Sequence, residues 1–381
     1  MSDFVRGLIL DLRGRCDILL AELEEAIVNA DLKDYANRTR SRILFVKTRL
    51  HHLLERLDSK AARYSARNVF FDFKERSNEI QFHEYISVPF VSRYDKHDIY
   101  FNRLLRLSCE QTGYPLAMPV GSTLGQAYYY SYPGEGIVVS PFLQAHSLLN
   151  LPDMFHELGH IIFNEYREWL KKPFNAMCDR YFSEQKAEAQ RLGGAEGFAE
   201  IISRIEYKWS GDWLGEFVCD VIGTYLVGEP YGWANLYLCA HTKSSDTVYM
   251  PDIRSFDVTV HPSDESRMRA IFSTVKYISP DTSLSDLQKD WSEYISTLGP
   301  EKPDHYDFFY PDNLIDGLVG AVIRSCEEIG LHSFVSSSTK NHDPYVVKLI
   351  ESAWKKFRTD PDGYVAWERE NISILRERLG L

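Results

Sequence analysis

The chain lacks long hydrophobic runs, paired cysteines and basic stretches, and each absence excludes a class of protein. No window reaches the roughly 18 apolar residues that a transmembrane helix needs, so we expect no membrane span. The short apolar segment at residues 8–10 lies between charges, which predicts no signal peptide. The six cysteines are scattered without C-x-x-C spacing, which predicts reduced thiols in a cytoplasmic protein.

The charge balance is acidic, and this limits the partners. A net charge of −12 without a basic cluster argues against nucleic acid as the main partner. Charged residues make up 26% and hydrophobic residues 44% of the 381 residues, which is typical of a globular protein with one large core or a few subdomains. Nothing in the sequence indicates an oligomeric state.

The most informative segment is His156-Glu157-Leu158-Gly159-His160. On a helix, the two histidines are four positions apart and project from one face, so they can bind one metal ion. Glu157 can reach a water at that metal rather than the metal itself. A catalytic zinc has three protein ligands and one open position, and it makes a water acidic enough for a glutamate to take its proton. The segment therefore predicts zinc-assisted hydrolysis of an amide bond.

The pentapeptide alone is equally compatible with an ordinary helix that carries two histidines. Its context favours a site, because the apolar residues 161–163 follow and indicate a buried helix. Gly159 lowers helix stability by about 1 kcal/mol relative to alanine, so we expect another backbone or a substrate to approach closely there.

A second segment supplies the third ligand. Glu216 and Asp220 lie one helical turn apart in a largely apolar stretch, where carboxylates need a partner. We expect Glu216 to bind the zinc and Asp220 to accept the far N–H of a ligating histidine. Cys219 is expected in the core. Other candidates are weaker because they lack this context, namely Glu188, Glu196, Glu200, Glu206, His146 and His241.

A third segment, His261-Pro262 followed by Arg267, completes a family pattern. The order H-E-x-x-H, E-x-x-x-D, H-P-x-x-x-x-R resembles that of the gluzincin zinc peptidases typified by the CAAX prenyl endopeptidases and the HtpX heat-shock protease. The matching residues are His156, Glu157, His160, Glu216, Asp220, His261 and Arg267. The resemblance covers about residues 125–275. It implies that Glu216 is a ligand and that His261 and Arg267 stabilise the oxyanion, with His261 alternatively closing the open metal position.

The remaining sequence predicts a mostly helical α+β fold, in which a zincin-like core with a small sheet is flanked by helices. We expect an N-terminal helical hairpin at 1–65, a catalytic domain at 66–300 and a C-terminal helical region at 301–381. Residues 128–140 have the pattern of strand, tight turn, strand. This hairpin is expected to present an edge to the metal cleft and hold extended peptide, although a purely structural role is equally compatible with the pattern.

The predicted function is that of a zinc peptidase acting on peptides or proteins, with Glu157 as general base. The alternative is a catalytically silent zincin-fold module for regulation or protein interaction that still binds zinc. An all-helical scaffold without metal is a third interpretation. The sequence identifies neither the substrate nor its cleavage preference.

Overall fold

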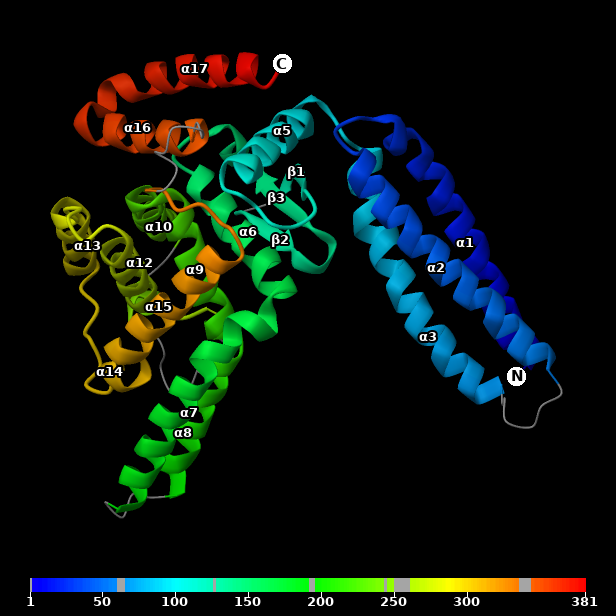
Figure 1. Ribbon diagram of the computed structural model, residues 1–381, viewed down its shortest axis with the longest axis horizontal. Helices are drawn as coiled ribbons and strands as arrows, with labels where there is room; N and C mark the ends of the chain where they lie inside the picture. Colours follow the sequence, from blue (N-terminus) through cyan, green and yellow to red (C-terminus); the bar gives the residue numbers. More distant parts are fainter. Residues whose placement is uncertain are drawn as a thin grey trace. The chain divides into compact units, whose positions relative to one another are not determined.

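The computed structural model describes residues 2–59, 66–125, 128–191, 196–242, 245–249, 261–335 and 344–381. Two compact units are present (Figure 1). The first contains residues 1–103 and 118–122, and the second contains residues 104–117 and 123–381. The predicted mostly helical α+β fold with a small sheet is confirmed. Within the described residues, the structure contains no helix that is both long and apolar enough to cross a membrane.

The first unit is built on long helices. They are α1 (Ser2–Val28), α2 (Lys33–Asp58), α3 (Ala66–Phe82), α4 (Val88–Ser92) and the start of α5 (Lys96–Gln111), with the π-helical turn η1 (His83–Ser87) before α4. Ion pairs join Arg6 to Asp58 and Lys47 to Asp17, so α1 and α2 run antiparallel, as predicted. The helix α3 packs against both of them, which the sequence did not predict.

The core of this helical pair follows helical spacing. In α2, Ile43, Val46, Leu50 and Leu53 are buried, and Leu57 is partly exposed. In α1, a buried stripe at helical spacing contains Val5, Ile9, Leu12, Cys16, Leu19, Leu23 and Ala26. The apolar faces of these two helices therefore account for their packing.

The sheet has three strands in the order β1-β3-β2. They are β1 (Val120–Gly125), β2 (Tyr130–Tyr132) and β3 (Ile137–Pro141). The predicted strand-turn-strand is confirmed, because β2 and β3 pair antiparallel with Ser131 opposite Val138. Between them lie the 3-10 turn η2 (Pro133–Glu135) and Gly136, whose φ of 66° is left-handed. The strand β3 is buried at the centre, whereas β2 is a half-buried edge strand that packs on α6.

Two helices at the centre of the second unit carry most of the predicted site. The helix α6 (Leu151–Glu165) packs closely on α9 (Asp212–Val227), in which every residue from Trp213 to Val227 is buried. A Cβ on Gly159 would lie 3.0 Å from the Cα of Cys219. The expectation that a backbone approaches this glycine is therefore confirmed, and Cys219 lies in the core.

The other helices of this unit surround that pair. They are α7 (Arg167–Arg191), α8 (Glu196–Ser210), α10 (Glu229–Thr242), α11 (Ser245–Val248), α12 (Asp264–Ile278), α13 (Ser285–Leu298), α14 (Tyr306–Phe309), α15 (Asp312–Glu328), α16 (Tyr345–Thr359) and α17 (Pro361–Arg378), with the 3-10 turn η3 (Gln144–His146) before α6. The helices α7 and α8 form a hairpin that projects from the rest of the unit (Figure 1). The helices α14, α15, α16 and α17 lie within the region 301–381 that was expected to be helical.

Candidate metal centre

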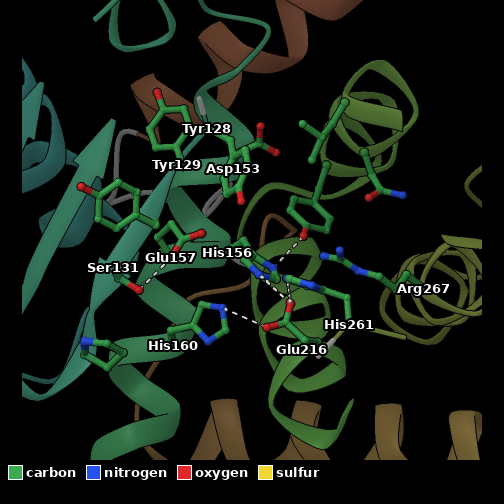
Figure 2. A pocket seen from close by; sticks show the side chains of 15 residues that line it. Tyr128, Tyr129, Ser131, Asp153, His156, Glu157, His160, Glu216, His261 and Arg267 are labelled. Carbon is green, nitrogen blue, oxygen red and sulfur yellow. Dashed lines mark hydrogen bonds and ion pairs between the residues drawn. The ribbon is translucent and has the colours of Figure 1, made fainter. Parts of the chain in front are cut away.

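His156 and His160 lie on one face of α6, as their spacing requires. Their ring centroids are 4.8 Å apart and the rings meet edge to face. His156 is buried, and His160 is partly exposed to a pocket (Figure 2). Burial lowers the pKa of His160 to about 4, so this imidazole is neutral at physiological pH and has a lone pair to offer.

Glu216 reaches the two histidines from α9. Its Oε2 is 3.5 Å from Nε2 of His156, and its Oε1 is 3.6 Å from Nε2 of His160. Ligands at about 2.0–2.1 Å from a tetrahedral zinc are roughly 3.3 Å from one another, so these separations suit three ligands around one ion. The Oε2 atom is also buried without a hydrogen-bond partner. A buried carboxylate oxygen in that state is stabilised by a cation, and the three residues therefore fit a zinc ion.

Glu157 faces the same space from the opposite side. Its carboxylate and the two imidazoles offer ligand atoms that all lie within 4.8 Å of one another. The Oγ of Ser131 in β2 donates a 2.8 Å hydrogen bond to Oε2 of Glu157. Burial raises the pKa of Glu157, and this hydrogen bond partly opposes that effect. Glu157 is thus held beside the metal position by the sheet, while Glu216 lies across it.

The second ring nitrogen of His156 has two partners. Its Nδ1 lies 2.9 Å from the hydroxyl of Tyr231 in α10 and 3.1 Å from Oδ1 of Asp220 in α9. The Tyr231 hydroxyl donates to Asp220 at 2.6 Å, so its oxygen is free to accept from Nδ1. Both partners favour a proton on Nδ1, which leaves the Nε2 lone pair for a metal. Burial opposes the charged ring, but Asp220 and Glu216 outweigh it and raise the pKa of His156 to about 10, so a metal that binds Nε2 must displace a proton from it.

Arg267 clamps Asp220 from the first turn of α12. Its Nε and a terminal nitrogen lie 2.7 and 2.6 Å from the two oxygens of Asp220, and both side chains are buried. Burial raises the pKa of Asp220, but the guanidinium outweighs it and holds that pKa well below its usual range. A fork-to-fork pair of this kind fixes orientation as well as charge. Two nitrogens of Arg267 are therefore committed to Asp220.

His261 lies just before α12, on the solvent side of the centre. Its Nε2 is 3.7 Å from Oε2 of Glu216, and 55% of its side chain is exposed. Pro262 and Ser263 follow, and the Ser263 hydroxyl accepts from the backbone N–H of Ser266 to cap the helix. The structure thus brings His261 and Arg267 to the same pocket, His261 at its rim and Arg267 in its wall.

The pocket has a volume of about 460 Å³, within the range of small-molecule and peptide sites. The β2 hairpin forms one wall through Tyr128, Tyr129, Tyr130, Ser131 and Pro133. Helix α10 forms another through side chains one turn apart, namely Tyr231, Asn235 and Leu238. The expected peptide-binding hairpin therefore lies beside the candidate ligands (Figure 2).

The competing acids are engaged elsewhere. Glu188 pairs with Arg191, Glu200 with Arg204 and Glu206 with Lys186, all in the α7–α8 hairpin. The side chain of Glu196 lies outside the described part of the chain. His146 lies in η3, and His241 bonds the backbone oxygen of Tyr237 in its own helix.

Sequence reasoning missed three polar residues of the pocket, Asp153, Tyr231 and Asn235. A signal existed for Asp153, which precedes His156 by three positions and so shares its helical face. No local signal existed for Tyr231 and Asn235, because their contact with the site depends on how α10 folds back after α9. Gly228 makes that turn with a φ of 75°.

The link to known proteins rests on the order of the three motifs described above. No family model, no curated protein and no solved structure matches this chain.

Proposed function

We propose that this protein is a zinc-dependent peptidase whose metal is held by His156, His160 and Glu216. The observation that carries the proposal is the triangle of their ligand atoms, with Glu216 Oε2 buried and unbonded at 3.5 Å from His156. The motif order shared with the gluzincins supports the same assignment. A bound zinc supplies a Lewis acid that polarises a carbonyl and acidifies a water.

Glu157 is the proposed general base. It lies in the pocket wall beside the ligand atoms, and Ser131 fixes one of its oxygens. The other oxygen is left to take a proton from the attacking water and to return it to the leaving amine. Its raised pKa makes Glu157 a stronger base than a surface glutamate.

The edge of β2 is the proposed peptide-binding element. This strand pairs with β3 on one side, and its residues line the pocket on the face that carries Ser131. An extended peptide can add to such an edge through main-chain hydrogen bonds, with its side chains alternating into and out of the pocket.

Arg267 acts in this proposal through Asp220, by fixing the carboxylate that orients His156. His261 is the group placed to face a developing oxyanion, since its half-exposed ring lies at the pocket rim. Removing one donor to an oxyanion costs about 3–4 kcal/mol of transition-state stabilisation.

One observation favours the second candidate, a zinc-binding module without peptidase activity. His261 Nε2 is 3.7 Å from Glu216 Oε2, close to the spacing of two ligands on one metal. If His261 occupies the fourth position, no water has access and the site is closed. His261→Ala would then raise hydrolysis, whereas an oxyanion role predicts a loss of at least about 100-fold.

The test of the proposed function is hydrolysis of a peptide library by the wild type and by Glu157→Gln. Glutamine keeps the shape but takes no proton, so we expect at least a 10²-fold loss with zinc content unchanged. Hydrolysis that survives this substitution would reject Glu157 as the base, and loss of zinc would make it a ligand instead.

A cytoplasmic location is also proposed. All six cysteines are buried and free, which suits a reducing compartment.

A further inference from the structure

Asp153 is a carboxylate of the pocket that the proposed chemistry does not use. It lies on α6 one turn before His156 and Glu157 and lines the same pocket. Figure 2 shows it beyond Glu157, on the side away from His160 and beside Tyr129. Its position in the first turn suits the positive end of the helix. Within the described part of the chain, however, no side chain donates a hydrogen bond to it or forms an ion pair with it.

Asn235 is a second polar group without a partner in this pocket. Only 4% of the residue is exposed, and its Nδ2 is buried without a hydrogen-bond partner. It lies one turn after Tyr231, whose hydroxyl contacts His156. A buried donor that stays unpaired is costly, and this one lines the pocket that a substrate would fill.

No cationic side chain of the described lining pairs directly with Asp153: burial raises its pKa to about 7, and the charges of His156 and Arg267 offset that effect only in part. Glu216 faces the two histidines, and Arg267 is committed to Asp220. Glu157 is held by Ser131 at the centre. The pocket therefore has a surplus acid on one side of the metal position and an amide donor on the neighbouring helix, and a bound cation with an adjacent carbonyl would satisfy both.

We propose that Asp153 and Asn235 form a subsite for a primary ammonium group of the substrate, with Asp153 accepting from the ammonium and Asn235 donating to a neighbouring carbonyl oxygen. The proposal rests on the peptidase function and adds its substrate class. A free amino terminus offers an ammonium and a neighbouring carbonyl, and a lysine side chain offers the ammonium alone. The subsite thus selects peptides by a cation close to the bond that is cut.

The experiment measures binding separately from hydrolysis. The probes are hexapeptide amides of uncharged residues in three forms: with a free amino terminus, with an acetylated terminus, and acetylated with one internal lysine. Zinc-loaded Glu157→Gln protein is equilibrated with each form by dialysis, and the bound peptides are read by mass spectrometry. The same measurement is made on two double variants, which combine Glu157→Gln with either Asp153→Asn or Asp212→Asn. The second is the control, because it removes a half-exposed acid from the first turn of α9.

We expect the free-terminus form to bind at least about 10-fold more tightly than the acetylated form, as the loss of a charge-assisted hydrogen bond implies. Asp153→Asn should abolish that preference and Asp212→Asn should keep it. If the internal lysine restores binding to the acetylated form, the subsite accepts a side-chain ammonium as well as a terminal one. If it does not, the subsite accepts the amino terminus alone. Equal binding of all three forms, or a preference that survives Asp153→Asn, overturns the subsite.

Asn235→Leu tests the second half of the subsite. It should weaken all three forms by a similar factor, because each contains the carbonyl, while the preference for the ammonium remains. Unchanged binding would remove Asn235 from the subsite. Wild-type protein is assayed for hydrolysis of the same peptides in parallel. Cleavage of all forms at equal rates, with equal binding, rejects the subsite and keeps the peptidase, whereas absence of any cleavage rejects the peptidase itself.

Discussion

Asp220 is the residue on which the candidate centre depends most beyond the ligands themselves. It contacts His156, Tyr231 and Arg267 while fully buried. A buried carboxylate that lost Arg267 would be strongly destabilised, because its charge would have no compensation. Asp220, which belongs to α9, therefore joins α6, α10 and α12 through its one side chain.

Asp220→Asn should weaken zinc affinity by roughly 10- to 100-fold, the usual effect of losing a group that orients a ligating histidine. Asparagine keeps the shape, but it pairs poorly with Arg267 and gives His156 a weaker acceptor. Competition with a zinc chelator measures the change. Tyr231→Phe, which removes one of the two partners of Nδ1, is expected to have a smaller effect in the same assay. Normal zinc affinity in Asp220→Asn would show that this contact has no role in holding the metal.

His83 gives a pH dependence that is independent of the metal centre. It is buried in η1 with Nδ1 at 3.1 Å from the Ser87 hydroxyl, and burial lowers its pKa from 6.5 to about 4. In the unfolded chain His83 therefore becomes protonated below its ordinary pKa of 6.5, whereas in the folded chain it is protonated only below a pKa of about 4. The contribution of neutral His83 to folding stability is fully present above its pKa in the unfolded chain. It is lost as the pH falls from that pKa to the lower pKa in the folded chain.

From this shift, acidification from about pH 7 to about pH 5 should cost the wild type about 2 kcal/mol through this one group. Urea unfolding followed by circular dichroism measures the cost, and His83→Gln, which does not titrate, should lose less stability by that amount. The account of His83 fails if the variant loses as much stability as the wild type.

At the scale of elements, the site is made by the close packing of α6 on α9. Gly159 permits that packing because its position faces the backbone of Cys219 at 3.0 Å from where a Cβ would lie. The contact sets how far Glu216 stands from the two histidines. A glycine that lowers helix stability thus permits the observed spacing between Glu216 and the two histidines.

Gly159→Ala should destabilise the protein by about 1–3 kcal/mol, because the neighbouring atoms belong to backbone and cannot turn away. It should also weaken zinc binding by moving α9. The matched control is Gly14→Ala in α1, where a Cβ meets nothing within 4 Å. That change should stabilise its helix by up to about 1 kcal/mol. Thermal unfolding of both variants measures the contrast, and equal effects of the same sign would argue against the packing explanation.

The elements also show which parts of the fold can be predicted from sequence. The hairpin of β2 and β3 and the faces of α1, α2 and α6 follow from periodicity and turn residues, which act within a few positions. Glu216 was distinguished from other acids by its apolar helix, and it lies across from His156 and His160. Tyr231 and Asn235 come from a helix whose contact with α6 is long-range, and periodicity contains no information on such contacts.

At the scale of the whole molecule, the candidate ligands all belong to the second unit. A ligand that binds only the folded state stabilises it by RT ln(1 + L/Kd), where L is the concentration of free ligand, and the segments that the ligand joins gain this protection. Zinc should therefore stabilise α6 and α9 and leave α1, α2 and α3 unchanged. Hydrogen exchange with and without a chelator should show faster exchange in α6 and α9, but not in α1, α2 and α3, when zinc is removed. Equal acceleration in α1, α2 and α3 would mean that the metal binds elsewhere or supports the whole chain.

The central claim is a zinc ion held by His156, His160 and Glu216, and metal analysis of the gently purified protein tests it most directly. The account predicts one zinc per chain in the wild type and in Glu157→Gln, and a large loss in Glu216→Ala. Wild-type protein with less than about a tenth of an equivalent of zinc after incubation with the metal, or full zinc content in Glu216→Ala, would contradict it, because a site that lacks one of its three ligands retains little affinity.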